Sequence, residues 1–208
     1  MSAIETSAAE RPSAVVSIRS RVPVGALVAV GAAVALVRWL VSRERTVFHI
    51  TPDEPAQLAI SRSLAGGARW NMFDNITFRP GYGLLLSPID RLIDDPVTLF
   101  RAGLGLNAVL GGISAVLLVV LARRLTTMSN AWCAFAAVLA SLAPAILFTT
   151  VYVWSEALTQ VLCLATLVVC LLLMDRPSAA RATGAIALAV AAFTSHSRML
   201  PLVVSVVV

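Results

Sequence analysis

Two acidic positions carry side chains that could do chemistry. Asp53 and Glu54 form an adjacent carboxylate pair between two prolines, about a dozen residues beyond the first apolar run, and Glu156 stands at the start of a later apolar run. A carboxylate can take the proton of a hydroxyl nucleophile or help to hold a divalent cation. Acids at the edge of a membrane are costly, which favours a functional role for both positions.

Each acidic position also has a purely structural interpretation. Thr51 and Glu54 have the spacing of a capping box and a proline suits the first helical position, so a short helix is predicted over 52–64. Ser155 could cap a later helix with Glu156 in its first turn. Acids in a first turn favour the helix dipole. Spacing alone favours these structural roles, and both interpretations stay open.

The two histidines give weaker signals. His49 precedes Asp53 by four residues, but helical spacing does not apply across a proline-marked helix start, so a metal-ligand role is not favoured. His196 lies in a short polar run inside an apolar segment and is interpreted as part of a helix break. The chain has no P-loop, GxGxxG, GxSxG or HExxH motif, which weakens ATP-driven transport, dinucleotide chemistry and metalloprotease schemes.

Composition decides the setting of these residues. The chain has 208 residues, of which 59% are hydrophobic and 13% charged, against roughly 45–50% and about 25% in soluble domains. A soluble globular enzyme and a disordered chain are therefore excluded. All 16 basic residues are arginine and they are dispersed, so nucleic acid is not expected as a partner. The arginine-only, alanine-rich composition is typical of a GC-rich bacterial genome.

The apolar runs predict an all-α fold, a polytopic transmembrane helical bundle of about five spans. Arg38, near the far end of the first span, is expected to extend toward the interface. The last span is broken by a polar run, and the chain stops within apolar sequence, which predicts the N-terminal part of a longer protein. The predicted segments are a cytoplasmic tail, a first span, an extracytoplasmic loop with short helices and four further spans: 1–21, 22–41, 42–101, 102–122, 131–151, 157–174 and 183–208.

The arginines in short loops predict the orientation. Arg123 and Arg124 follow the second span and Arg176 and Arg181 follow the fourth, whereas the connection at 152–156 has no basic residue. Basic loops face the cytoplasm. We therefore expect a bacterial cytoplasmic membrane protein with a cytoplasmic N-terminus, although the arginines in the 42–101 loop, at the length limit of the rule, argue against this orientation.

Several short motifs occur in a definite order along the chain, and this order is more specific than any one of them. They resemble the N-terminal half of the GT-C membrane glycosyltransferases, nearest to bacterial members related to protein O-mannosyltransferases and lipid A aminoarabinose transferases. The resemblance covers residues 22–208. The motifs are Asp53-Glu54-Pro55, Gly66-Gly67, the run from Arg79 to Pro88, Asp95-Pro96, Phe100-Arg101, Asn107, Ser155-Glu156-Ala157-Leu158, and the broken run Thr194 to Arg198 followed by Pro201.

What the resemblance implies is sugar transfer from a polyprenyl-phosphate donor to an extracytoplasmic acceptor, with membrane lipid around the spans. Asp53 matches the first-loop acid of the family, which acts as general base or helps to hold a divalent cation, the one cofactor implied. Glu54 is its neighbour in the motif, and Glu156 matches the acid after the third span. Arginine suits phosphate, and the substrate-binding candidates in the loop are Arg62, Arg79, Tyr82 and Arg101.

The chain departs from the family pattern at two places, and these leave the substrate class open. Gln57 or Ala56 stands where many relatives carry an aromatic residue, and Gly83 replaces the proline of a Gly-Tyr-Pro motif. The alternative function is a non-enzymatic polytopic membrane protein, such as a transporter piece or an assembly subunit, because the broken fifth segment resembles a discontinuous transporter helix. Enzyme acids are expected at the outer interface, and transporter acids near the midplane.

Overall fold

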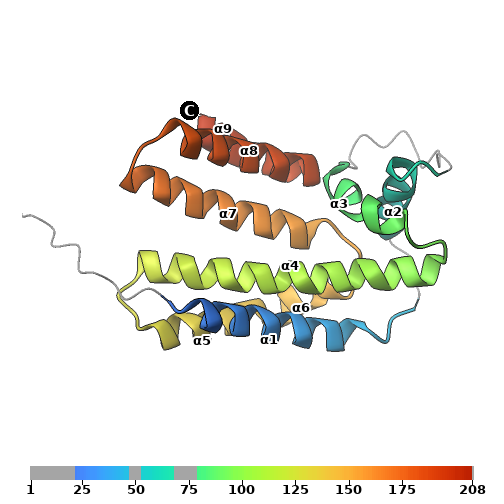
Figure 1. The fold of residues 1–208 in the computed structure, drawn as a ribbon, viewed down its shortest axis with the longest axis horizontal. Helices are drawn as coiled ribbons and strands as arrows, with labels where there is room; N and C mark the ends of the chain where they lie inside the picture. The colour runs from blue at the N-terminus through green and yellow to red at the C-terminus, as the bar shows by residue number, and fades with distance from the viewer. Residues whose placement is uncertain (1–21, 47–52, 68–78, 208) are drawn as a thin grey trace, which may run out of the picture.

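The computed structural model describes residues 22–46, 53–67 and 79–207, and every regular element within these ranges is helical (Figure 1). The all-α fold class is confirmed for this part of the chain. The elements are α1 (Val24–Ser42), α2 (Asp53–Leu64), α3 (Gly81–Asp90), α4 (Pro96–Leu125), α5 (Asn130–Ser141), α6 (Pro144–Thr150), α7 (Glu156–Asp175), α8 (Ala179–Ser195), the 3-10 turn η1 (Ser197–Met199) and α9 (Leu200–Val207).

Within the described ranges, three helices are long and apolar enough to cross a membrane: α1, α4 and α7. The pair α5 and α6 makes a fourth if it counts as one span, although its two halves meet at an angle of 61°. The bend falls before Pro144, where the missing N–H cannot continue α5. The sequence predicts about five spans. Helix α8, which begins the predicted fifth span, has 17 residues and is about 26 Å long, whereas a hydrocarbon core is about 30 Å thick. The fifth span is therefore not confirmed.

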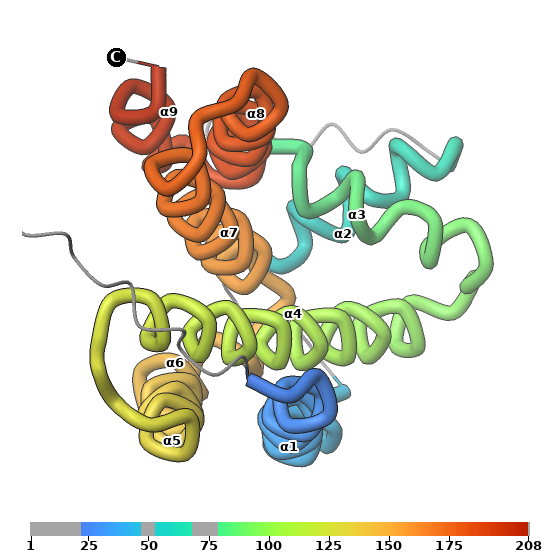
Figure 2. Tube along the Cα trace, turned by 60° about the vertical axis from the view of Figure 1, so that its left-hand side comes forward, coloured from blue at the N-terminus to red at the C-terminus, as the bar shows by residue number. Residues whose placement is uncertain are grey.

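Helix α4 is the central element of the bundle. Figures 1 and 2 show α1 and α5 on one side of it and α7 on the other, and α8 packs on α7. Its start is set by Asp95, whose side chain accepts from the N–H of Thr98 at 2.8 Å, and by Pro96 in the first helical turn. Hydrogen bonds from the Thr98 hydroxyl and N–H hold the pKa of Asp95 below its usual value.

The contact between α1 and α4 depends on small residues. A Cβ on Gly112 would overlap the carbonyl oxygen of Gly31, and a Cβ on Gly31 would lie 3.1 Å from the side chain of Val116. Glycine at these places lets the two backbones approach as closely as membrane helices do at small-residue interfaces.

The same interface buries Arg38, so the expectation that its side chain extends toward the interface is wrong. Arg38 is fully buried, and its Nη2 donates to the carbonyl oxygen of Ser141 at 3.0 Å. Its guanidinium occupies the space that a side chain at Gly111 would fill. The Ser141 carbonyl belongs to the last turn of α5, whose acceptors have no intrahelical partner because the helix breaks before Pro144. The buried Arg38 guanidinium therefore caps this break through Nη2.

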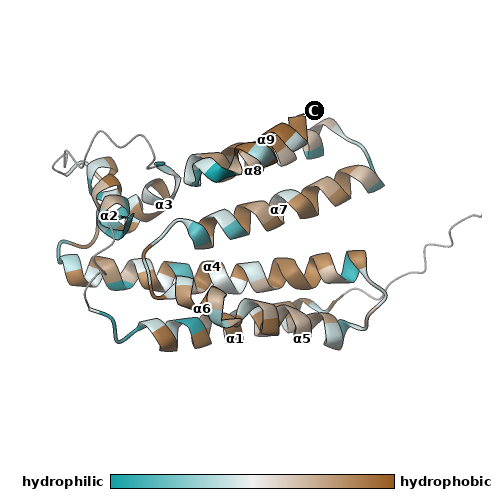
Figure 3. Cartoon of the chain, turned by 180° about the vertical axis from the view of Figure 1, so that it is seen from behind, coloured by the Kyte–Doolittle hydropathy of each residue, from teal (hydrophilic) through white to brown (hydrophobic). Residues whose placement is uncertain are grey.

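The two ends of the bundle differ in the side chains that they carry. Figure 3 shows hydrophilic residues gathered toward the ends of the long helices and hydrophobic ones along their lengths. The end that carries α2 and α3 is called the loop end below. The opposite end is called the arginine end and carries Arg123, Arg124, Arg176 and Arg181.

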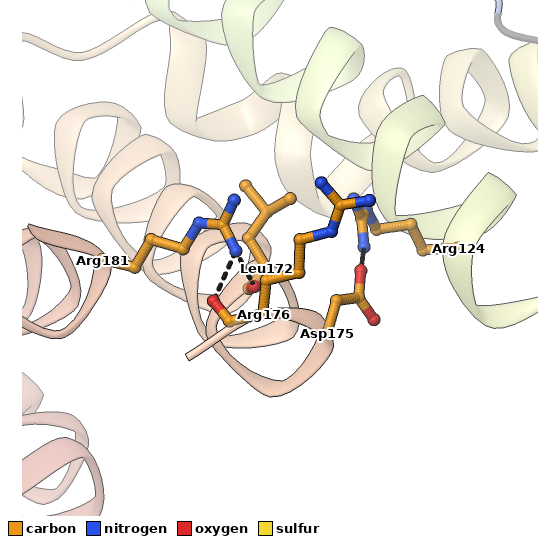
Figure 4. A network of polar contacts seen from close by, with 5 residues as sticks. All are labelled: Arg124, Leu172, Asp175, Arg176 and Arg181. Carbon is orange, nitrogen blue, oxygen red and sulfur yellow. Dashed lines mark hydrogen bonds and ion pairs between the residues drawn. The ribbon is translucent and has the colours of Figure 1, made fainter. Parts of the chain in front are cut away.

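Polar contacts tie the arginine end together (Figure 4). Arg124, at the end of α4, forms an ion pair with Asp175, the last residue of α7. Arg181, in the first turn of α8, donates to the carbonyl oxygen of Leu172 at 2.9 Å and to that of Arg176. These bonds satisfy carbonyls at the C-terminus of α7 and join it to its two neighbours.

Replacing Gly112 with alanine is expected to destabilise the bundle by about 1–3 kcal/mol, because the new methyl group would force α1 away from α4. Thermal unfolding in detergent micelles, followed by circular dichroism, measures the change. Gly184→Ala is the matched control, since Gly184 also lies inside a helix and a Cβ there would make only ordinary contact at 3.8 Å. Equal stability of the two variants would contradict the close α1–α4 contact.

Candidate functional site

A polar cavity of about 340 Å³ lies at the loop end. Its volume falls within the range of about 300–1,000 Å³ that is common for small-molecule sites. Four separate segments of the chain meet there: the start of α2, the short segment before α3, the start of α7 and the break after α8. The lining residues are Asp53, Gln57, Arg79, Trp154, Ser155, Glu156, Ser195, His196, Ser197 and Arg198.

The first wall of the cavity is α2. Asp53 is its first residue and is exposed, and Gln57 lies one turn further on and is buried. The helix ends where the sequence predicts, and Gly66 leaves it with a positive φ of 93°. A Cβ on Gly83 of α3 would overlap the side chain of Ile60 of α2. Glycine is therefore required at position 83, because α2 and α3 pack closely there.

Glu54 does not line the cavity, although it is adjacent to Asp53. It is fully buried, its Oε1 accepts from the backbone N–H of Val153 at 2.9 Å, and the same oxygen lies 3.6 Å from Nη1 of Arg45. The Arg45 guanidinium also lies 5.0 Å from the ring centre of Tyr152. Glu54 therefore holds the connection between α6 and α7, and the predicted catalytic pair divides into one cavity residue and one positioning residue.

A second bond fixes the same connection from the side of α4. Asn107 donates from its Nδ2 to the carbonyl oxygen of Tyr152 at 2.7 Å, and both residues are buried. The side chain of Val153 fills the space beside Gly103, where a Cβ would lie 2.9 Å away. Trp154 and Glu156 follow directly, so these contacts set their position in the cavity wall.

The opposite wall joins the start of α3 to the end of α8. The Arg79 guanidinium lies over the ring of Phe193, 4.6 Å from its centre. A Cβ on Gly81 would lie 2.6 Å from Oγ of Ser195, so the two elements touch at this point. This packing brings Arg79 to the polar run 194–198, although more than a hundred residues separate them.

The polar run 194–198 breaks the apolar segment as the sequence predicts. Helix α8 ends at Ser195, and His196 is extended before η1. Nδ1 of His196 accepts from the backbone N–H of Arg198 at 3.2 Å, so the neutral ring carries its proton on Nε2. That nitrogen lies 4.0 Å from Oε1 of Glu156. The break therefore places a histidine opposite the acid at the start of α7.

Three of the predicted substrate-binding residues lie elsewhere. Arg62 pairs with the buried Asp90 at 2.9 Å and ties α2 to α3. Tyr82 is fully buried and donates from its hydroxyl to the carbonyl oxygen of Gly103 at 3.2 Å; burial, and then the charge of Glu54, raise its pKa above the usual value. Arg101 is exposed on α4 and does not line the cavity.

Ser155 occupies the N-cap position of α7 with Glu156 in the first turn, as the sequence predicts, but the expected side-chain cap does not form. Ser155 directly precedes α7 but has a helical backbone conformation, with φ −72° and ψ −10°, and its side chain makes no cap bond. Its carbonyl oxygen instead accepts from the N–H and the hydroxyl of Thr159. The capping-box residue Thr51 and the metal-ligand candidate His49 lie outside the described residues.

A divalent cation was implied by the family resemblance. In the described part of the chain, no group of three or more His, Cys, Asp or Glu side chains comes together as a metal site. Asp53 and Glu156 line the cavity with one histidine, and this donor set does not by itself make a cluster, so no step below is routed through a metal.

Sequence reasoning missed several residues of the cavity. Gln57, Trp154 and Arg198 were not among the predicted site residues, and His196 was interpreted only as part of a break. The available signal was partial: the predicted orientation puts the first loop and Glu156 on one face, whereas the polar run 194–198 lies inside the predicted span 183–208.

Comparisons of the chain with protein-family models, with curated proteins and with solved structures found no match. The fold and the site therefore define a class only by their own properties: a helical protein with three or four candidate membrane spans in its described residues and a polar cavity at one end of the bundle.

Glu54→Ala is expected to destabilise the protein by about 3 kcal/mol, because it breaks a buried ion pair and leaves the Val153 N–H without its acceptor. Hydrogen–deuterium exchange should be faster for the backbone amides of residues 151–155, and the midpoint temperature of thermal unfolding should fall in parallel. Glu44→Ala is the matched control: its ion pair with Arg43 is exposed, so a change within about 0.5 kcal/mol is expected. Unchanged exchange at Val153 in the Glu54 variant would contradict the positioning role.

Proposed function

We propose that the chain acts as a membrane glycosyltransferase of the GT-C type, which moves a sugar from a polyprenyl-phosphate donor to an extracytoplasmic acceptor. One observation carries the proposal. Asp53 and Glu156, the two acids that the family pattern singles out, come from distant parts of the chain and line the same cavity, together with the predicted phosphate ligand Arg79.

The cavity has the groups that such a transfer requires. The acceptor oxygen attacks the anomeric carbon, its proton passes to Asp53, and the bond from that carbon to the phosphate oxygen breaks. The polyprenyl phosphate leaves with the electron pair. Asp53 is exposed and can reach a hydroxyl, and the guanidinium groups of Arg79 and Arg198 suit the charge that develops on the leaving phosphate.

Glu156 has a different surrounding from Asp53 and a different role. It faces Nε2 of His196 across 4.0 Å and is half-buried. We assign it to hydrogen bonds with hydroxyl groups of the bound sugar or acceptor. The prenyl chain of the donor would lie along the exposed apolar faces of α1, α4 and α7, where large apolar side chains such as Leu36, Val109 and Leu167 are open.

The depth of the acids supports an enzyme over a transporter. Asp53 is the first residue of α2, which is not a candidate span, and Glu156 is the first residue of the candidate span α7. Transporter sites lie near the middle of the bilayer, between broken helices. A non-enzymatic role would gain support if both acids could be replaced with effects on stability alone.

We also propose the orientation that the arginines predict, with a cytoplasmic N-terminus, a bacterial cytoplasmic membrane and the loop end outside. To test it, Cys133, Cys163 and Cys170 are replaced by alanine and one cysteine is introduced at Asp94 (loop end) or at Arg176 (arginine end). Both positions are exposed. A membrane-impermeant maleimide should label intact cells at position 94 and should label position 176 only after lysis. The reverse pattern would overturn the orientation.

Asp53→Asn should lower sugar transfer by about 10²–10⁴-fold, the contribution of a positioned proton acceptor. Glu156→Gln should lower it by about tenfold to a hundredfold, because it loses a charged hydrogen-bond acceptor. In the assay, membranes that contain the expressed protein receive polyprenyl phosphates that carry radiolabelled mannose, glucose or aminoarabinose. The amount of radiolabelled sugar released from the carrier lipid measures transfer. Asp94→Asn, an exposed acid at the same end but outside the cavity, should retain full transfer. Full transfer by Asp53→Asn would exclude the proposed base.

A further inference from the structure

Of the buried side-chain polar atoms that have no hydrogen-bond partner among the described residues, three belong to side chains that line the cavity. They are Oε1 of Gln57, Nε1 of Trp154 and Nε of Arg79. A buried polar group without a partner is destabilising, so each such group requires an explanation. Because these three belong to residues that line one cavity, a polar molecule bound there can supply their partners.

The unpaired groups are held in place rather than left loose. Gln57 is only 4% exposed on α2. The Trp154 indole stacks on the Tyr152 ring with 4.3 Å between centres and 16° between planes, and the Tyr152 backbone is fixed by the bond from Asn107. Arg79 is fixed over the Phe193 ring. Because the contacts within the protein already determine their positions, these groups form a preorganised set of one acceptor and two donors.

The chemistry of the set indicates its ligand. A glutamine oxygen accepts only from a donor, and an indole N–H donates only to an acceptor. A hydroxyl group does both, so a polyhydroxylated ring can satisfy both residues with neighbouring oxygens. An anion alone would leave the Gln57 oxygen unpaired, and an apolar ligand would leave both residues unpaired. Arg79 and Arg198, by contrast, suit an attached phosphate.

We propose that Gln57 and Trp154 form the sugar subsite of the cavity. Gln57 accepts a hydrogen bond from one ring hydroxyl through Oε1, and Trp154 donates from Nε1 to another ring oxygen. The inference rests on the proposed function and deepens it, because it names the residues that distinguish a sugar-bearing carrier from the bare carrier. Gln57 or its neighbour Ala56 stands where many members of the family that the chain resembles carry an aromatic residue, so this part of the cavity differs from theirs.

The test compares two lipids on the purified full chain in nanodiscs. The probes are polyprenyl phosphate and the same lipid carrying mannose, glucose or aminoarabinose. For each protein, the affinity for a sugar-bearing lipid divided by the affinity for the bare lipid gives the sugar-dependent ratio. Gln57→Leu removes the acceptor and Trp154→Phe removes the donor but keeps an aromatic ring. Each variant should lower the ratio about threefold to tenfold, the factor that one neutral hydrogen bond supplies, while binding of the bare lipid stays unchanged.

Matched controls separate this effect from general damage to the fold. Trp132→Phe changes an exposed tryptophan of α5, and Gln160→Leu changes a glutamine of α7 that does not line the cavity; both should keep the wild-type ratio. Unchanged binding of the bare lipid and unchanged helix content verify that each variant is folded.

The outcomes distinguish the two proposals. If the wild type prefers a sugar-bearing lipid and both cavity variants retain that preference, the sugar subsite is wrong and the proposed function stands. If the wild type binds every sugar-bearing lipid no better than the bare lipid, both proposals fail. Loss of the ratio in the two cavity variants with retention in the controls supports the sugar subsite.

Discussion

The hydrogen bond between Glu54 and the backbone N–H of Val153 is the constraint on which the site depends. It joins the first loop of the chain to the connection between α6 and α7, two segments that share no local sequence pattern. Asp53 precedes one partner, and Trp154 and Glu156 follow the other. The buried Glu54 carboxylate therefore helps to set the relative position of the two walls that carry the cavity's acids, and its role is structural.

The amount of the fold that could be predicted depends on the kind of signal. Apolar length located α1 and α7 closely, and the paired glycines located the end of α2. Hydropathy placed the start of the second span at residue 102, whereas α4 begins at Pro96 because Asp95 caps it. Hydropathy also merged α5 and α6, since it counts apolar residues and does not register that Pro144 removes a backbone donor.

For the site, the predicted topology could indicate only which residues lie on the same face of the membrane. The predicted orientation puts Asp53 and Glu156 on one face, and the structure brings them together with the polar run 194–198, which the sequence places only as a break inside a span. The separation of Glu54 from Asp53, and the use of Arg62 to pair with Asp90, depend on tertiary contacts that no spacing encodes. Charged side chains at this end of the bundle therefore divide between structural pairs and the cavity, and their sequence motifs do not distinguish the two.

The buried guanidinium of Arg38 lies in the space that the missing side chain of Gly111 provides, and it completes the broken end of α5 at Ser141. These three positions lie on three different helices, yet each is acceptable only in the presence of the others. A larger residue at position 111 would expel the arginine, and a smaller one at position 38 would leave both a void and an open carbonyl. In related sequences, the residues at positions 38 and 111 should therefore change together, although the two positions lie far apart in the chain.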